Sequence, residues 1–350
     1  MAYTTIDDPG LFFNIKLYTG NSGTQTLTGV GFQPNLTWIK QRSDNTDNTL
    51  YDSVRGATYR LRSNSAVVEA TDVGLTAWNS DGFNIGNHDS TNLNNGTYVG
   101  WNWKAETAFS NDASATSVGS IDSAGSVNTT AGFSIITYTG TGSNATVAHG
   151  LGAVPKIIIV KGRNTDEGWI VYHGANTSAP ATDYLRLDTS GATVDAADIW
   201  NDTSPTSSVF SIGDSGKVND TKNYVAYCFA EKQGYSKFGS YKGNANADGT
   251  FVYLGFKPAY VIVKQTNTGD EPWIIKDNKR EPRNINTGID SATLFASVNS
   301  AESNRDAMDF LSNGFKCRDG GAPANSGSYV YLAFAESPFV TSKGVPATAG

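Results

Sequence analysis

The most regular hydrophobic pattern in the chain is a short apolar segment that follows a proline and ends in a lysine. It occurs at residues 36–40, 157–161 and 260–264, after Pro34, Pro155 and Pro258. The four consecutive β-branched residues at 157–160 predict a central strand covered on both faces, because such a run offers no polar side to solvent. Since proline can start a strand but not lie inside a central one, we expect each strand to begin after its proline.

A second pattern alternates along three later segments, 98–103, 224–229 and 329–334, each of which begins with a tyrosine. In a strand, alternate residues share one face. One face therefore carries large apolar residues and is predicted to be core, while the other is small enough to pack under a neighbour. The core-face residues are Val99, Trp101, Trp103, Val225, Tyr227, Phe229, Val330, Leu332 and Phe334.

These two patterns recur in the same order together with a Tyr-Thr-Gly or Tyr-Lys-Gly element and a turn that ends in phenylalanine. The spacing is roughly 100 to 120 residues, which is the size of a domain rather than of a solenoid unit. Many short strands separated by turns predict an all-β chain of three tandem antiparallel β-sandwich repeats of the jelly-roll type. The segment 300–311 is expected to hold a strand before its turn.

The predicted organisation follows from these landmarks. An N-terminal segment (1–12) precedes repeat 1 (13–106), and a Ser/Ala/Thr/Gly-rich stretch (107–130) reads as a flexible linker. Repeat 2 (131–231) is joined closely to repeat 3 (232–340), and a polar tail (341–350) ends the chain. Repeats 2 and 3 are expected to dock, while repeat 1 either swings or is placed by other contacts.

Composition narrows the classes of partner. Charged residues are 17 % and the formal net charge is −7, without a basic run. Such a chain gains no counterion-release energy on DNA, so we expect no nucleic-acid partner. Neither a signal peptide nor a membrane-spanning apolar stretch is visible, and we expect no membrane insertion. Cys228 and Cys317 occupy different places in their repeats, which predicts free thiols.

The chemistry-bearing residues do not form a recognisable catalytic or metal site. His88, His149 and His173 sit at unmatched places in surface or loop sequence, whereas zinc needs three or four convergent ligands. No nucleophile motif occurs and no pair of carboxylates stands out. The oxygen-rich loops 44–48 and 87–92 favour solvated turns over calcium sites. We therefore expect no enzyme activity, no cofactor, no catalytic residues and no bound metal.

Carbohydrate recognition through aromatic rings is the most plausible ligand chemistry. Most aromatic residues in the variable middle of each repeat alternate with apolar residues and are expected in the core. Trp200 differs, because Asp198 precedes it and Asn201 and Asp202 follow it. We predict that Trp200 is an exposed loop aromatic and that Trp200, Asn201 and Asp202 contact a ligand.

Segments 1–9, 31–40, 50–56, 79–83 and 98–105 resemble a family of virion proteins of marine bacteriophages, including cyanophages and pelagic phages. The similarity is strong over repeat 1. Repeats 2 and 3 keep the framework but lack the Tyr-Asp-Ser-Val-Arg-Gly element.

The resemblance implies a structural, fibre-like role on the phage particle. We expect a non-enzymatic protein of the tail or tail fibre that presents its sandwiches for attachment to the host surface, with a glycan as the expected receptor. A capsid decoration or cement protein is the alternative. The expected partners are other virion proteins and a host glycan, the expected oligomer is a homotrimer, and the location is the virion after assembly in the host cytoplasm.

Overall fold

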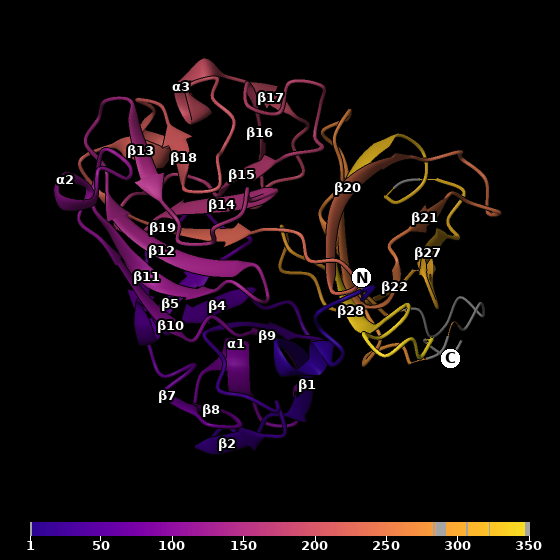
Figure 1. Cartoon of the computed structure of the whole chain (residues 1–350). Coiled ribbons are helices and arrows are strands. Elements are labelled where there is room, and N and C mark those ends of the chain that lie inside the picture. The colour runs from indigo at the N-terminus through magenta and orange to yellow at the C-terminus, as the bar shows by residue number, and fades with distance from the viewer. Residues whose placement is uncertain (1, 283, 285–291, 306, 322, 347–350) are drawn as a thin grey trace.

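The computed structural model describes residues 2–282, 284, 292–305, 307–321 and 323–346. Regular structure in these residues is almost entirely antiparallel β-sheet, which confirms the predicted all-β class (Figure 1). The helices are single turns: η1 Pro9–Leu11, α1 Asp89–Asn92, α2 Ala113–Thr116, α3 Ala197–Trp200 and α4 Gly216–Asn219.

The three large sheets share one strand order. In each repeat the strand that holds the recurring tyrosine near its start, which we call the Tyr-led strand, lies between the first strand of the repeat and the strand that holds the recurring lysine, which we call the lysine strand. Repeat 1 has β1 Phe13–Thr19, β9 Thr97–Trp103, β3 Leu36–Gln41, β4 Thr49–Asp52, β5 Gly56–Arg62 and β6 Ala70–Thr71. Repeat 2 has β12 Phe133–Thr139, β19 Asn223–Phe229, β14 Ile157–Gly162, β15 Ile170–His173, β16 Asp183–Arg186 and β17 Val194–Asp195. Repeat 3 has β20 Ser236–Lys242, β28 Ser328–Pro338, β22 Phe256–Gln265, β23 Ile274–Asp277, β24 Ala292–Phe295 and β25 Ser303–Asn304.

A smaller sheet packs on one face of each large sheet and completes a sandwich. The small sheets are β2 Gln25–Thr28, β8 Gly82–Ile85 and β7 Ala77–Asn79; β13 Ala145–Ala148 and β18 Val209–Ile212; and β21 Phe251–Tyr253, β27 Gly314–Cys317 and β26 Met308–Leu311. Buried apolar residues of both sheets meet in the core of each sandwich, as Phe83 of β8 does with Ile39 of β3. The strand expected within 300–311 is confirmed as β26.

The glycine of the recurring Gly-Phe turn has a steric reason. A Cβ on Gly82 would lie 2.0 Å from the carbonyl oxygen of Leu27, and one on Gly314 would lie 2.0 Å from that of Val252. Glycine therefore lets β8 and β27 approach the neighbouring strand closely. The phenylalanine that follows, Phe83 or Phe315, is fully buried.

Two expectations about chain organisation were wrong. The segment 107–130 is not a free linker: β10 Thr107–Asn111 and β11 Ser123–Asn128 pair with each other and with β12, so repeat 2 has an eight-stranded sheet. Pro258 does not precede its strand but lies inside β22, at a shift of register against β28. A bulge tolerates proline because the ladder hydrogen bond is already interrupted there.

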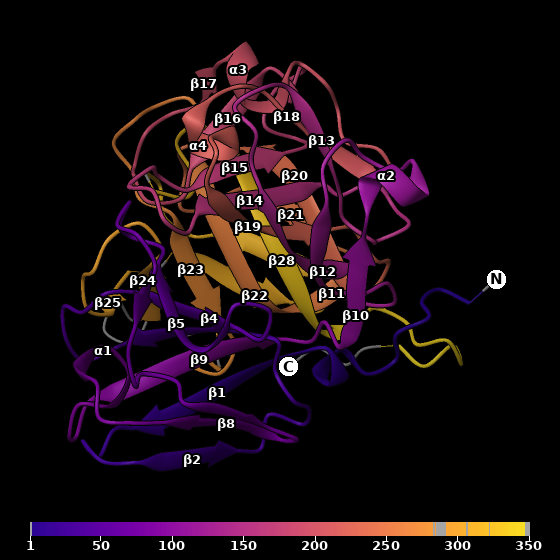
Figure 2. The same cartoon turned by 90° about the vertical axis from the view of Figure 1, so that its left-hand side faces the viewer.

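The three large sheets share one hydrophobic core. Their outer faces, on the side away from the small sheets, all contribute to a single buried cluster. Trp101, Tyr227 and Leu332, one from each Tyr-led strand, belong to it. The face predicted as core is therefore packed against the other repeats, and the opposite face packs under the small sheet of its own repeat. Figures 1 and 2 show the three lobes grouped around this common centre.

The N-terminal segment contacts repeat 3 and the segment that follows it. The Tyr3 hydroxyl donates to the carbonyl of Gly255 at 2.6 Å, and Thr4 donates to that of Gln233 at 2.8 Å. Asp7 accepts from the backbone N–H of Ser342 at 2.6 Å. Repeat 1 is thus held by the shared core and by its N-terminal segment, which answers the question of whether it swings.

Candidate functional site

The candidate site is the set of polar contacts that joins the repeats around the shared core, which we call the inter-repeat ring. At its centre lies a small cavity of about 30 Å³ lined only by apolar surface. Trp38, Ile159 and Ile262, from equivalent positions of the three lysine strands, line it. A dry, apolar centre means that the polar groups of the ring are arranged around the core rather than inside it.

Three equivalent lysines form the most symmetrical part of the inter-repeat ring. Lys40, Lys161 and Lys264 are fully buried, and burial lowers the pKa of each ammonium group to about 8. Each donates to carbonyl oxygens of its own loop and to one carbonyl of another repeat. The inter-repeat acceptors are Asn299 at 3.2 Å for Lys40, Ala66 at 2.9 Å for Lys161 and Ser190 at 2.8 Å for Lys264.

These contacts have one direction. The lysine of repeat 1 donates to a carbonyl of repeat 3, that of repeat 3 to a carbonyl of repeat 2, and that of repeat 2 to a carbonyl of repeat 1. Head-to-tail contacts of this kind close into a ring when the rotation between units allows it. Backbone bonds two residues beyond each lysine follow the same cycle: Glu302 N–H to Arg42 O, Glu69 N–H to Arg163 O, and Thr193 N–H to Thr266 O.

Two of the three interfaces add a buried network of charges. Between repeats 2 and 1, Arg163 pairs with Glu69 at 2.7 Å, and Glu69 pairs with Arg55 at 2.8 Å. Arg55 is held by Asp52 at 2.5 Å, and Asp52 accepts from the Tyr227 hydroxyl at 2.7 Å. Buried charges need such complete pairing, because an unpaired one carries a large desolvation penalty.

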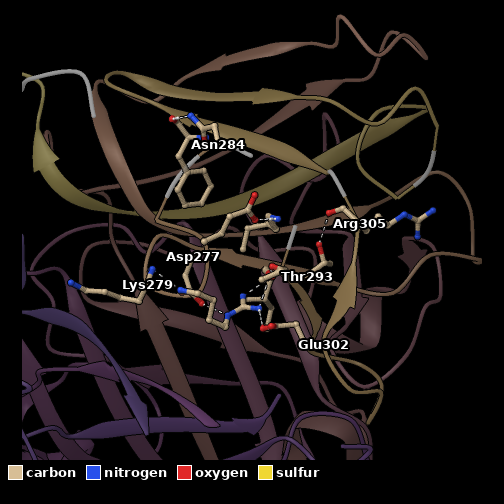
Figure 3. A network of polar contacts seen from close by, with 12 residues as sticks. Asp277, Lys279, Asn284, Thr293, Glu302 and Arg305 are labelled. Atoms are coloured by element: carbon tan, nitrogen blue, oxygen red, sulfur yellow. Dashed lines mark hydrogen bonds and ion pairs between the residues drawn. The ribbon is translucent and has the colours of Figure 1, made fainter. Parts of the chain in front are cut away.

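Between repeats 1 and 3 an equivalent network is built from other residues, and Figure 3 shows its repeat 3 part around Asp277 and Glu302. Arg42 pairs with Glu302 at 2.8 Å, Glu302 with Arg280 at 2.9 Å, and Arg280 with Asp277 at 2.6 Å. Asp277 accepts from the Trp101 indole at 3.0 Å. Burial disfavours the charge of Arg280, but Asp277 and Glu302 beside it raise its pKa above the ordinary value for arginine. Burial disfavours the charged Glu302 too, yet hydrogen bonds and charge from the two arginines lower its pKa.

The shared signal for both networks is an aspartate followed three residues later by an arginine, at Asp52/Arg55 and Asp277/Arg280. Repeat 3 lacks the full Tyr-Asp-Ser-Val-Arg-Gly element, so the whole motif does not reveal that its aspartate and arginine are kept there as Asp277 and Arg280. Aligning on charge spacing alone would have found them.

The interface between repeats 3 and 2 has no such network among the described residues. His173 stands where the other repeats have aspartate, and Leu332 stands where they have Trp101 or Tyr227. His173 is buried and its Nε2–H donates to the carbonyl of Tyr331 at 3.1 Å, while Nδ1 accepts from Ala175 N–H. Burial lowers the pKa of His173 to about 4. A neutral hydrogen-bonding group thus replaces the ion pairs at this interface.

The predicted exposed aromatic was wrong. Trp200 ends the single-turn helix α3, is only 2 % exposed and packs edge-on against Tyr172. Asn201 and Asp202 follow it with left-handed backbone and are exposed. Polar neighbours mark the end of a short helix here rather than an exposed ring, so the three residues do not form a joint surface.

The histidines and the oxygen-rich loops have structural partners. His149 and His173 are buried rather than on the surface, and His88 caps α1 by accepting from Ser90 N–H. The carbonyls of Asp44 and Thr46, in the loop considered for calcium, bind the Lys40 ammonium. Across the described ranges, no His, Cys, Asp and Glu side chains group to hold a metal ion.

Both cysteines are free, as the sequence predicted, and the structure shows that both are buried. Burial raises the pKa of the Cys228 thiol to about 12 and that of the Cys317 thiol to about 11. Of the helices that the structure describes, none is both long and apolar enough to cross a membrane.

Comparison with known proteins gives a family without a known activity. No curated protein matches the chain. One family model, described as a domain of unknown function (DUF7483), matches residues 8–338, so a single match spans all three repeats and the whole inter-repeat ring. The chain therefore belongs to the DUF7483 family of domains of unknown function.

Proposed function

We propose that this chain is a non-enzymatic structural protein of a bacteriophage virion, part of the tail or tail fibre, which presents its β-sandwiches for attachment to the host surface. The proposal rests on the resemblance of repeat 1 and the N-terminal segment to marine phage virion proteins. The observation that supports it most is the inter-repeat ring. The buried charged groups at its interfaces join one repeat to another, which is what a rigid, assembled building block requires.

The distribution of sequence variation supports the same role. The lysines that recur build the ring, whereas the position next to the paired inward residue of the small sheet differs: Thr28, Ala148 and Tyr253. A scaffold that keeps its interior and varies its surface is suited to contact with partners.

Locating the chain in purified particles tests the proposal. We expect antibody labelling and cryo-electron microscopy to place it on the tail, at a low copy number by quantitative mass spectrometry. Labelling spread over the capsid lattice at high copy number would instead support a decoration protein. Absence from purified particles would overturn both roles.

The homotrimer expected from the sequence is part of this proposal. Light scattering should then give a mass of three times 37.2 kDa. A mass of one chain would contradict the trimer, and the threefold arrangement would be confined to the three repeats within a single chain.

A further inference from the structure

An exposed aromatic pair lies on one strand of repeat 3. Phe251 and Tyr253 in β21 are 45 % and 49 % exposed, while Val252 between them is buried. Their alternation puts both rings on the outer face of the small sheet, about 7 Å apart along the strand. Large aromatic side chains gain stability when buried, so two exposed rings side by side are not explained by folding.

The other repeats provide an internal comparison at the same positions. The inward residue of the strand pairs with the recurring phenylalanine in every case: Leu27 with Phe83, Val147 with Phe210, and Val252 with Phe315. The flanking residues are the exposed Thr26 and Thr28 in repeat 1, and the partly exposed Thr146 and the buried Ala148 in repeat 2. Since small residues serve the fold at these positions, the aromatic pair of repeat 3 serves something else.

The pair continues into a larger aromatic surface where the N-terminal segment contacts repeat 3. The half-buried Tyr3 ring packs edge-on against Phe339 at 6.5 Å, and its hydroxyl is bound to the carbonyl of Gly255, close to Tyr253. We call Phe251, Tyr253, Tyr3 and Phe339 the aromatic strip. The N-terminal segment therefore completes a surface on repeat 3.

Polar groups border the aromatic strip. Lys316 lies directly across from Phe251 and pairs with the exposed Asp248, and Arg318 pairs with Asp309 at 2.5 Å in the same small sheet. Lys316 and Asp248 can donate and accept hydrogen bonds next to Phe251, whereas Asp309 is buried and serves only to hold Arg318. Both charge signs are present, so the border matches a polyhydroxylated ligand better than a polyanion.

One feature argues against a peptide strand as the occupant. Lys237 lies over the Tyr253 ring at 5.2 Å and donates to the Tyr253 carbonyl at 2.8 Å. A lysine on the backbone of an edge strand blocks the hydrogen bonds that an added strand would need. Phe251 and Tyr253 nevertheless remain about half exposed, so a ligand can reach Phe251 and the part of Tyr253 that Lys237 does not cover.

We propose that the aromatic strip binds a polysaccharide, with the C–H faces of successive pyranose rings stacked on Phe251 and Tyr253 and their hydroxyls bonded to the polar border. This deepens the proposed attachment function and rests on it.

The test uses the full chain on a microarray of purified bacterial lipopolysaccharides and capsular polysaccharides. Phe251→Thr/Tyr253→Thr gives repeat 3 the outward threonines of repeat 1, and Thr26→Ala/Thr28→Ala is the matched control. We expect wild type to bind one or more polysaccharides, the control to bind equally, and the repeat 3 variant to lose affinity about tenfold or more. All three should melt alike, because the substituted side chains are exposed.

Equal binding by the repeat 3 variant, or binding by wild type to none of the arrayed polysaccharides, would overturn the site. Both results are independent of the particle experiment. A chain that is found on the tail but binds unchanged without its aromatic pair would leave the virion role standing and remove only the proposed site.

Discussion

The Trp101 indole of repeat 1 donates to the Asp277 carboxylate of repeat 3 at 3.0 Å, across 176 residues of sequence. The Tyr227 hydroxyl of repeat 2 makes the same contact with Asp52 of repeat 1 at 2.7 Å. Each bond joins the Tyr-led strand of one repeat to the aspartate of another. The position of one repeat against the next is therefore fixed by specific hydrogen bonds between buried side chains.

Replacing Asp277 should be strongly destabilising. Asp277→Ala leaves Arg280 buried beside Glu302 alone, and we expect a loss of about 3–5 kcal/mol in the free energy of unfolding. Glu336→Ala removes an exposed partner of Lys257 and should cost under about 1 kcal/mol. Urea unfolding followed by tryptophan fluorescence measures both, and similar losses for the two variants would contradict the buried network.

The three lysines should contribute differently to the free energy of unfolding, according to how many carbonyl oxygens each one binds. Lys161 donates to four carbonyl oxygens, Lys40 to three and Lys264 to two. Substitution by methionine leaves those oxygens without a donor, at about 1–3 kcal/mol overall. We expect the destabilisation to decrease from Lys161→Met to Lys40→Met to Lys264→Met at pH 7 in chemical denaturation. The reverse order would show that the carbonyl contacts do not set the stability.

The same lysines should make the protein more stable at moderately alkaline pH. The folded-state pKa of about 8 lies below the ordinary 10.5, so between these values the unfolded chain binds protons that the folded chain does not. Stability therefore rises as pH increases from 8 to 10.5, by at most about 3 kcal/mol for one lysine. Over this pH range the free energy of unfolding of wild type should rise relative to that of Lys161→Met, as measured by chemical denaturation. A constant difference between the two proteins would show that the pKa of Lys161 is not lowered by folding.

Acid should weaken the interface between repeats 3 and 2 first. His173 has a folded-state pKa of about 4 against an ordinary 6.5, so its contribution is complete above pH 6.5 and is lost as pH falls through 4. The loss amounts to about 3 kcal/mol at most. In urea titrations, the stability of His173→Gln should fall less than that of wild type between pH 6.5 and 4. The carboxylates titrate in both proteins, so they do not account for the difference. Parallel pH profiles would place the acid sensitivity elsewhere.

The sequence was sufficient to predict individual strands but not what they pack against. Alternation in Val99, Trp101 and Trp103 identified a core face, yet periodicity within one strand carries no information on which sheet covers it. The three buried lysines were visible as strand ends, and their carbonyl partners lie in loops of other repeats. Such contacts depend on the rotation between repeats, which no local pattern encodes.

The failures have the same physical origin. The stretch 107–130 has few large apolar residues, but Val127 of β11 is buried in the core of repeat 2 and Phe109 of β10 packs against that core. The strand ladders of β10 and β11 hold the rest of the stretch on the sheet. The exposure of Trp200 was predicted from its polar neighbours. These neighbours mark the end of the one-turn helix α3, while the Trp200 ring itself is buried. In both cases tertiary packing overrides local composition.

A ring made from one polypeptide differs from a ring of identical subunits in what it can distinguish. Identical subunits must carry any change three times, so every side of the assembly is alike. Here one junction replaces its ion pairs with His173, and one lobe alone bears Phe251 and Tyr253. A ring encoded in a single polypeptide therefore has three sides that differ from one another, so that the molecule can contact a partner in one defined orientation.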